Sequence, residues 1–373
     1  MQIIEVKSKR ELMQFIRFQR QLYKGNPYFV PPLERMERTM FSPQNVMAEA
    51  CDYKLWMVKE GKTILGRIAG IINHHFNKDQ KIKQARFTHF DCVERQEVAQ
   101  LLLSTVEQWA QQQGMEEFIG PFGFNNLDKH GLLVEGFEVL ACQSSNYNYP
   151  YYAQFIENYG FTKRHDWVER SITIPEKAPD RITRFAKVLR ERNALHILDL
   201  SDKNTLKEYT PRILDLYNET YAKLYGVSPL NEAQKQYLLK SFIPLLDTDL
   251  VSVVVNEEDQ IVAFGITIHS LSRSLQKAQG RLFPFGFIHL MRAKKNNPIL
   301  DLLLIGIHPD YQRKGLNALI FDDIQKGIYK HKISIMETTQ NLESNQDVQN
   351  LWADYESVLN RRARLYQKKI KKA

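Results

Sequence analysis

Cysteine is scarce in this sequence, and its spacing excludes several classes of protein. The 373 residues include three cysteines, Cys51, Cys92 and Cys142, which lie far apart and form no Cys-x-x-Cys pair. An odd number at such spacing predicts neither a disulfide framework nor a structural zinc site. We therefore expect a protein of the reducing cytoplasm.

Long apolar runs and the short motifs of several enzyme classes are also absent. No apolar run approaches the roughly 20 residues needed to cross a bilayer, and residues 1–15 lack the features of a secretory signal. There is no His-Glu-x-x-His, no Walker A loop and no Ser/His/Asp arrangement. His74 and His75 are adjacent, and neighbours on a strand point to opposite sides, so they would not share a metal. We expect no metal cofactor.

Acidic residues are missing from two stretches of an otherwise balanced chain of net charge +8. Residues 361–373 contain seven basic residues and no acidic one, which a solvated terminal tail would explain. A nucleic-acid binder is the rival interpretation, and it predicts salt-dependent binding that is lost when 361–373 is deleted. We regard nucleic acid as an unlikely partner, because a phosphate-bearing small ligand accounts for local basic surface equally well.

The second stretch without acidic residues, 271–300, contains six basic residues. It belongs to an insert, residues 270–298, in which the cations are interleaved with Phe283, Phe285, Phe287, Leu290 and Met291. A helical flap covered by the rest of the protein is the interpretation we favour. A surface that lies on an anionic membrane, or a lid over an apolar substrate, is the alternative.

Apolar periodicity and capping residues predict the elements of a first half, residues 1–176. Ser8-Lys-Arg-Glu11 has the spacing of a capping box, so a helix should start there after a strand at 3–6. Gly114 is placed to end a long amphipathic helix. The other expected elements are a helix at 33–40, a hairpin of strands 55–58 and 64–72, strands at 87–92 and 117–120, a helix at 151–159 and a strand at 161–174.

A second half, residues 177–373, follows the Pro175–Pro179 linker and repeats this order of elements. The expected elements are a helix at 180–192, a strand at 195–200, helices at 206–224 and 232–242, a hairpin of strands 251–255 and 261–269, a strand at 302–307 with a helix after it, a strand at 332–337, a helix at 345–358 and a strand near 362–366. The repeat lies in element order and not in residue identities.

Residues 302–318, LLLIGIHPDYQRKGLNA, are the most informative stretch. An apolar, strand-like run stops at His308-Pro309, and apolar residues from Leu316 onward recur at helical spacing. Between them lies the basic, glycine-containing turn Gln312-Arg-Lys-Gly315. Strand, such a turn and a helix N-terminus form an arrangement that binds phosphate through backbone N–H groups and the helix dipole. An ordinary strand–turn–helix connection without a ligand is the alternative.

This stretch resembles the coenzyme A-binding motif of the GNAT acyltransferase superfamily, Gln/Arg-x-x-Gly-x-Gly/Ala after a β-strand. Gln312 to Gly315 match, whereas Asn317 departs from the last position and is followed by Ala318. Over nearly its full length the chain is similar to long bacterial proteins with tandem GNAT-like halves. Stretches that carry this similarity include Asn26–Pro32, Gly66–Gly70, Gly131–Phe137, Tyr149–Tyr152 and Gly280–Gly286.

The resemblance implies an α/β fold of two tandem GNAT-like domains, each a twisted, mostly antiparallel sheet flanked by helices. The first domain would lack the cofactor site, because Asp91–Glu97 after its equivalent strand has three carboxylates and no glycine. The second would bind acetyl-coenzyme A, or another acyl-coenzyme A, as co-substrate. The residues implied are Ile305, Ile307, Gln312, Arg313, Lys314, Gly315, Leu316, Asn317, Ala318 and Asn345.

The same resemblance implies catalytic candidates. The family often carries a tyrosine that protonates the leaving thiolate, and Trp352 stands at that position, so Tyr355, about one helical turn further on, is the substitute. Glu337, at the end of the strand beside the motif strand, is the candidate base for the acceptor amine. A core role for Tyr355 and a structural role for Glu337 are the alternatives.

A long loop rich in Gly, Asn and Tyr, residues 120–152, is the candidate acceptor site. Ordered loops of that length are commonly functional. We expect it to line a pocket between the halves or, as the alternative, only to pack the halves together. The residues predicted to bind the acceptor are Asn125, Glu135, Tyr147, Asn148 and Tyr152.

Taken together, these features predict a cytoplasmic enzyme that moves an acyl group, with acetyl favoured, from coenzyme A to an amine of a small molecule or protein. The rival class is a non-catalytic acyl-coenzyme A sensor or scaffold, which the altered Asn317 and Trp352 favour. Both classes predict ligand binding, but only the enzyme predicts release of free coenzyme A in the presence of an amine.

Overall fold

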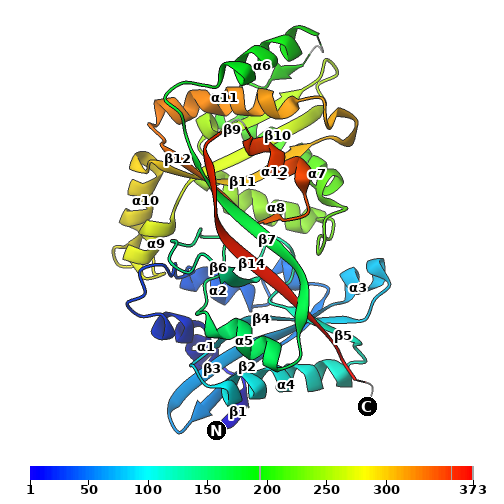
Figure 1. The fold of residues 1–373 in the computed structure, drawn as a ribbon, viewed down its shortest axis with the longest axis vertical. Coiled ribbons are helices and arrows are strands. Elements are labelled where there is room, and N and C mark those ends of the chain that lie inside the picture. Colours follow the sequence, from blue (N-terminus) through cyan, green and yellow to red (C-terminus); the bar gives the residue numbers. More distant parts are fainter. Residues whose placement is uncertain (193–194, 354, 372–373) are drawn as a thin grey trace.

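A computed structural model describes residues 1–192, 195–353 and 355–371 of the chain (Figure 1). In the first half the elements are β1 (Gln2–Glu5), α1 (Lys9–Leu22), α2 (Glu34–Met40), β2 (Cys51–Glu60), β3 (Thr63–Asn73), α3 (His74–Gln80), β4 (Gln84–Cys92), α4 (Gln96–Gln112), β5 (Glu117–Gly120), β6 (Leu132–Glu135), α5 (Tyr151–Asn158) and β7 (Thr162–Thr173).

The second half continues with α6 (Asp180–Arg192), β8 (His196–Ile197), α7 (Lys203–Tyr221), α8 (Glu232–Phe242), β9 (Val251–Val255), β10 (Ile261–His269), α9 (Ser272–Ala278), α10 (Gly286–Asn296), β11 (Ile299–Ile307), α11 (Leu316–Lys330), β12 (Ile335–Thr338), β13 (Asn341–Leu342), α12 (Gln346–Gln349) and β14 (Ser357–Lys369). Short 3₁₀ turns lie at Val46–Ala48, Ile243–Leu245, Thr248–Leu250, Pro309–Tyr311 and Asn350–Trp352.

Local sequence signals explain several of these elements. Ser8 is the N-cap of α1. Its hydroxyl accepts the Glu11 N–H, and the Glu11 carboxylate accepts the Ser8 N–H, as a capping box requires. Gly114 has φ +73° just after α4, where a residue with a side chain would be strained. The expected hairpins are confirmed, with strand pairs β2–β3 and β9–β10.

One sheet of 14 strands runs through the whole molecule, in the order β1-β2-β3-β4-β5-β14-β7-β12-β11-β10-β9-β8, with β6 and β13 attached beside β14 and β7. The two halves exchange strands at its centre. β14, from the end of the chain, pairs with β5 of the first half, and β7, from the first half, pairs with β12 of the second. β7 and β14 pair with each other along the long crossing ribbon that joins the two lobes in Figure 1.

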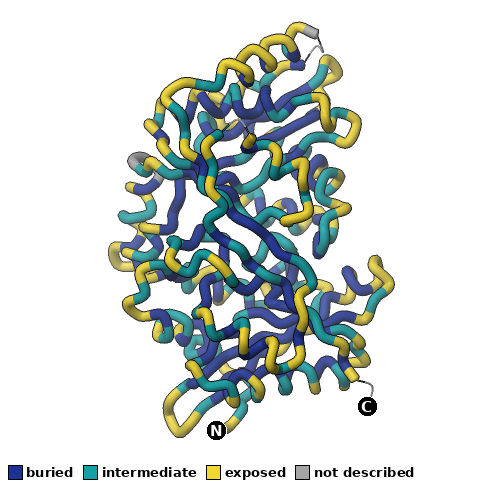
Figure 2. Tube along the Cα trace, viewed as in Figure 1, coloured by how far each residue is buried: buried dark blue, intermediate teal, exposed yellow. Residues whose placement is uncertain are grey.

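Apolar side chains form a core on each side of each half-sheet. α4 and α5 cover one face of the first half, and α6 and α11 cover one face of the second. A third core joins the halves, because Phe15 and Phe124 of the first half belong to the same cluster as Tyr217 and Phe264 of the second. Most of the central ribbon is buried or half-buried, as Figure 2 shows. The fold is thus a mixed α/β structure with a continuous interior.

The solvated tail expected for residues 361–373 is wrong over its described part. Arg361 to Lys369 lie in β14, and the side chains of Arg361, Arg362, Arg364 and Lys368 pair with carboxylates of other elements. Arg361 is 2% exposed, its Nε lies 3.2 Å from Glu169, and Arg364 bonds Asp166 at 2.9 Å. The arginines of this strand therefore neutralise buried carboxylates such as Asp166 and Glu169.

Two other expectations of the second half also fail. The helix expected at 345–358 is reduced to α12 and a 3₁₀ turn, because the chain becomes β14 from Ser357. The insert at 270–298 is helical, but it is not a covered flap, since Phe283 and Phe285 are 78% and 68% exposed. None of the helices in the described residues is both long and apolar enough to cross a membrane.

Candidate active site

The turn between β11 and α11 has the backbone geometry of an anion cradle. Arg313 and Gly315 have positive φ angles, +60° and +81°, so the chain reverses direction just before the first turn of α11. Glycine suits position 315 because φ +81° would strain a residue with a side chain, and a Cβ there would lie 2.0 Å from the Phe185 ring of α6 unless that ring moved. The sequence motif therefore forms the strand, turn and helix that it predicts.

Unpaired donors point out of this turn. Among the described residues, the backbone N–H groups of 314–317 have no protein acceptor, and no side chain caps α11. Arg313 is held only by an exposed ion pair with Asp347 at 3.6 Å, and Lys314 lies over the Tyr311 ring. Free N–H groups, the helix dipole and two exposed cations fit a diphosphate such as that of coenzyme A.

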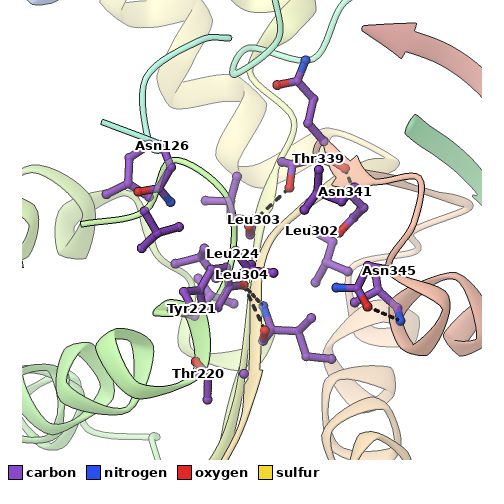
Figure 3. Close-up of a pocket in the computed structure, with 18 of the residues that line it drawn as sticks. Asn126, Thr220, Tyr221, Leu224, Leu302, Leu303, Leu304, Thr339, Asn341 and Asn345 are labelled. Carbon is purple, nitrogen blue, oxygen red and sulfur yellow. Dashed lines mark hydrogen bonds between the residues drawn. The ribbon is translucent and has the colours of Figure 1, made fainter. Parts of the chain in front are cut away.

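Next to the turn, β11 separates from β12 and exposes one backbone edge. The two strands pair in parallel up to Leu302 and Thr338, and Thr339 then bonds the carbonyls of Leu302 and Leu303 at 3.2 and 3.3 Å. Beyond that point the Tyr221 hydroxyl of α7 donates a hydrogen bond to the Ile305 carbonyl at 3.0 Å and accepts one from the Ile305 N–H at 3.4 Å. Figure 3 shows Tyr221 against this edge of β11.

A cavity of about 680 Å³ runs along this edge. At one end it is lined by Gln312, Arg313 and Asn317 of the turn and by Asn345, which precedes α12. At the other end it passes between α7, α8 and the sheet, where the lining is almost wholly apolar. Its volume is in the range of small-molecule sites.

The first half contributes a carboxylate and an imidazole to the cavity, while Lys223, Arg313 and Asp347 come from the second half. The cavity lining includes Asn126, Asp128 and His130, from the loop between β5 and β6. Burial raises the pKa of Asp128 to about 6, and it lowers the pKa of His130 to about 4. The Asp128 Oδ2 accepts the N–H of Phe124 at 2.8 Å, which fixes the carboxylate, while Oδ1 has no hydrogen bond within the described part of the chain.

His130 is neutral at pH 7 and has a defined tautomer. Its Nδ1 lies 2.8 Å from the backbone carbonyl of Asp128, an acceptor only, so Nδ1 carries the proton and Nε2 has a free lone pair. The ring is held by Trp167, with centroids 4.4 Å apart. Asp128 and His130 therefore line a cavity whose other lining includes the phosphate turn of the second half.

The predicted cofactor residues come together, although not all reach the cavity. Ile305, Ile307, Gln312, Arg313, Asn317 and Asn345 line it. Gly315 and Leu316 form the turn and the start of α11, and Ala318 is buried behind them. Lys314 is on the turn, with its ammonium 5.2 Å from the Tyr311 ring. The Asn345 side chain caps α12 by accepting the N–H of Val348.

The predicted catalytic pair lies beside the cavity and not in its lining. The Glu337 carboxylate accepts hydrogen bonds from Ser171 and Asn360, both at 2.9 Å, and shares a face of the sheet with buried Asp301. Tyr355 packs its ring against Phe321 and Trp352. Their catalytic roles remain predictions.

The five predicted acceptor residues are also outside the lining, although their loop reaches it. Tyr147, Asn148 and Tyr152 are buried and hold the loop through hydrogen bonds to Asn26, to the backbone of Leu133 and to Cys92. Asn125 caps its own turn, and Glu135 pairs with Arg362 at 3.1 Å. They support the loop from which Asp128 and His130 project.

Sequence reasoning missed Tyr221, Asp128 and His130. The last two follow Asn125 in the loop already identified as functional, and a search for titratable side chains in that loop would have found them. Nothing in the local pattern marks Tyr221, which is one of several tyrosines in α7.

Away from the cavity, one cluster of side chains could hold a metal ion. One ligand atom each from Asp247, His269 and His331 lie within 4.8 Å of one another. The His331 Nε2 lies 3.5 Å from a carboxylate oxygen of Asp247 and 3.2 Å from one of Asp249, contacts that form without a metal. His331 is the C-cap residue of α11, at the opposite end of that helix from the phosphate turn.

No protein-family model matches the chain. Two curated proteins do. Protein YghO of Escherichia coli (strain K12) is 23% identical over 373 residues, 97% of this chain and 94% of that protein. The bacterial ceramide synthase of Caulobacter vibrioides is 25% identical over 326 residues, 83% of this chain and 81% of that protein.

Solved structures show the same architecture. A tandem GNAT protein from the clavulanic acid biosynthesis pathway aligns over 100% of this chain and 99% of its own, with a TM-score of 0.58 and 11% identity. A fungal GCN5-related glucosamine N-acetyltransferase region aligns with 98% of this chain and 38% of its own, at TM-score 0.56 and 10% identity. The chain therefore has the tandem GNAT fold, and the fold expected from its motifs is confirmed.

Proposed function

We propose that this protein is an N-acyltransferase that takes an acyl group from coenzyme A and gives it to an amine. The observation that carries the proposal is a single cavity lined by Gln312, Arg313 and Asn317 at the phosphate turn and also by Asp128 and His130. Within the described residues, the N–H groups of 314–317 in that turn have no protein acceptor. The GNAT fold supports it, because acyl-coenzyme A donors and amine acceptors go with that fold.

The donor would lie along β11. Its diphosphate would bind the turn at residues 312–317, and its pantetheine arm would follow the exposed strand edge at Ile305 and Ile307. The Tyr221 hydroxyl is hydrogen-bonded to the backbone N–H and carbonyl of Ile305, so it would have to turn away from them toward the donor. A phenol that close to the thioester can donate a hydrogen bond to the carbonyl or a proton to the departing thiolate.

The reaction balances without a further co-reactant. The amine nitrogen attacks the thioester carbonyl, the C–N bond forms, and the C–S bond breaks with its electron pair on sulfur. One proton leaves the nitrogen and one proton returns to the thiolate, which gives an amide and free coenzyme A. An amine of pKa near 10.4 is about one part in a thousand neutral at pH 7, so a base in the cavity is useful.

Asp128 is the proposed base, with His130 as a hydrogen-bond acceptor that orients the amine. A base works best when its pKa lies near the working pH, and the pKa of Asp128, raised to about 6, meets that condition better than the His130 pKa of about 4. Because Asp128 belongs to residues 1–176 and the phosphate turn to residues 177–373, the proposed domains would both contribute to one site.

The non-catalytic sensor remains the second candidate, and one observation favours it. Tyr221 occupies the strand edge that would pair with the donor, and Tyr355, the predicted acid, is outside the cavity lining. The relatives do not decide between the two. The name of one of them, a ceramide synthase, supports an enzyme that acylates an amine, and we extend only that class of chemistry to this chain.

Two measurements test the proposal in order. Calorimetry should first detect free coenzyme A binding to the full-length protein and much weaker binding to Gly315→Ala. A thiol-release assay with an acyl-coenzyme A and a panel of amines should then show amine-dependent release that Asp128→Asn reduces. Binding without release under any amine would favour the sensor, and failure to bind coenzyme A would refute both candidates.

A further inference from the structure

The apolar end of the cavity is larger than an acetyl group needs. Beyond the strand edge the cavity continues between α7, α8 and the sheet, past Leu303 and Leu304 of β11. Its wall there is formed by the side chains of Ile213, Leu214, Leu238, Leu239, Phe242, Ile243, Leu246 and Ile266. Figure 3 shows Leu303 and Leu304 beside Tyr221 and Leu224, where the polar and apolar ends meet.

The side chains that line this end of the cavity are apolar, and they do not fill it. Leu238 and Leu246 are buried in the core that joins the halves, whereas Phe242 at the end of α8 remains 37% exposed beside them. The pairing of β10 with β11 shifts register between Ile266 and Thr267, which leaves Leu303 as an extra residue in β11, and Ile266 and Leu303 both line the cavity. An empty apolar cavity loses packing contacts, which an apolar ligand would restore.

We propose that this apolar end binds the alkyl chain of a long-chain acyl-coenzyme A, so that the transferred group is a fatty acyl group and not acetyl. The inference rests on the proposed function, since it extends the same site. It follows from continuity, because a chain attached to a thioester at Leu303 and Leu304 has only this apolar space in which to lie. Charged groups line the opposite end and would exclude it.

An alkyl chain could also belong to the amine acceptor. Both sources share the chemistry that the cavity recognises, and their order of binding separates them. If the chain is the donor's, long-chain acyl-coenzyme A binds tightly without an amine. If the chain is the acceptor's, the acyl length makes no difference to donor binding, while a long-chain amine binds without any donor.

The test is a calorimetric series on the full-length protein with free, acetyl-, octanoyl- and palmitoyl-coenzyme A, with no amine present. Affinity should rise by roughly fourfold for each methylene that enters the apolar end. Equal affinity for acetyl- and palmitoyl-coenzyme A would overturn this inference while leaving the proposed function intact. Lack of binding by free coenzyme A would instead refute the proposed function.

A filling variant locates the chain. Leu239→Trp adds a ring to the cavity wall, so it should lower palmitoyl-coenzyme A affinity more than tenfold and leave acetyl-coenzyme A affinity unchanged. Tyr237→Trp is the matched control on the same helix, because Tyr237 does not line the cavity. If Leu239→Trp lowers both affinities equally although the protein remains folded, the chain lies elsewhere. The series on the unmodified protein stands even if the variant misfolds.

A different observation carries a second proposal, about the insert between β10 and β11. Phe283, Phe285, Phe287 and Met291 are 78%, 68%, 41% and 64% exposed, and we call them the aromatic patch. The opposite side of α9 and α10 is anchored, with Leu275 and Ala293 in a core shared with the first half. In Figure 1 the two helices form one flank of the molecule.

We infer that the aromatic patch docks on an anionic membrane surface. A group of phenylalanine side chains exposed to solvent is unfavourable in free energy unless a partner covers it. The charge around them fits anionic lipid, because residues 271–300 contain six basic residues and no acidic one, and the Arg292 side chain is exposed. Aromatic side chains flanked by cations are the composition of interfacial helices.

Co-sedimentation with vesicles tests this surface. The protein should bind phosphatidylglycerol-containing vesicles at low salt, and Arg292→Gln should weaken binding roughly fivefold. Phe283→Ser with Phe285→Ser should abolish it, whereas Val358→Ser, an equally exposed apolar site outside the patch, should not. Binding that is equal for the double variant and Val358→Ser, or absent from anionic vesicles, would overturn the inference.

Discussion

Replacing the proposed base, Asp128→Asn, should remove one ionisation from the pH dependence of the reaction. The pKa of Asp128 is raised to about 6 by burial, so its carboxylate is about nine-tenths ionised at pH 7 and about one-tenth ionised at pH 5. A base must be ionised to accept a proton. In a plot of the logarithm of kcat/KM against pH, the slope should therefore be one unit larger below pH 6 than above it.

The magnitude at pH 7 follows from general base catalysis, which typically contributes 10²- to 10⁴-fold. Asp128→Asn should lower kcat/KM by that order and should show no change of slope near pH 6. Glu337→Gln is the control, because Glu337 is held by Ser171 and Asn360 outside the cavity lining. If Glu337→Gln loses the break at pH 6 and Asp128→Asn keeps it, the assignment of the base is wrong.

Thermal unfolding separates a loss of catalysis in Asp128→Asn from misfolding of the variant. The folded protein raises the pKa of this carboxyl, so its ionised form is disfavoured on folding. The contribution of the Asp128 carboxyl to the free energy of unfolding is therefore fully present below the pKa of this group in the unfolded chain. That contribution is lost as the pH rises through about 6. The asparagine carries no charge and can still accept the Phe124 N–H, so the variant should be at least as stable as the parent at pH 7.

Three further predictions concern the cofactor site and the central strands. Gly315→Ala should lower coenzyme A affinity at least tenfold in calorimetry, because its Cβ would meet the Phe185 ring, whereas Gly61→Ala, also at positive φ but with nothing within 4 Å, should bind normally. Tyr221→Phe should lower kcat but not weaken donor binding; a raised Kd would show that the hydroxyl only anchors the donor. Arg361→Ala should reduce the free energy of unfolding in urea by about 3–5 kcal/mol, because it leaves the buried Glu169 carboxylate unpaired.

Much of the fold could be predicted because its signals are local. The capping box at Ser8, the turns of the hairpins and the periodicity of α4 and α11 involve residues a few positions apart. The phosphate turn is local too, since strand, glycine and helix are consecutive. These features depend on backbone geometry that short stretches of sequence determine, so neighbouring residues were sufficient evidence.

The failures share a different cause. Residues 361–369 look like a basic tail because their partners, Asp166 and Glu169 among them, lie nearly 200 positions earlier in the chain. The helix expected at 345–358 stops early because Ser357 pairs with Ile172 of β7. In both cases a distant strand overrides the local pattern, and a single sequence contains no sign of that pairing.

The strand exchange also explains why the candidate base could not be predicted from the motif. β14 and β7 cross between the half-sheets, so the β5–β6 loop of the first half is brought against β11 and α7 of the second. Asp128 and His130 thereby line the same cavity as the phosphate turn, whose motif is almost 200 residues away. The first half, which lacks the glycine turn, would then serve as the wall that carries the acid–base groups. A cut at 176/177 would separate β7 from β14 and the turn from both groups, so we expect neither fragment alone to release coenzyme A in the thiol assay, and activity to return only where the two fragments re-form the β7–β14 pair.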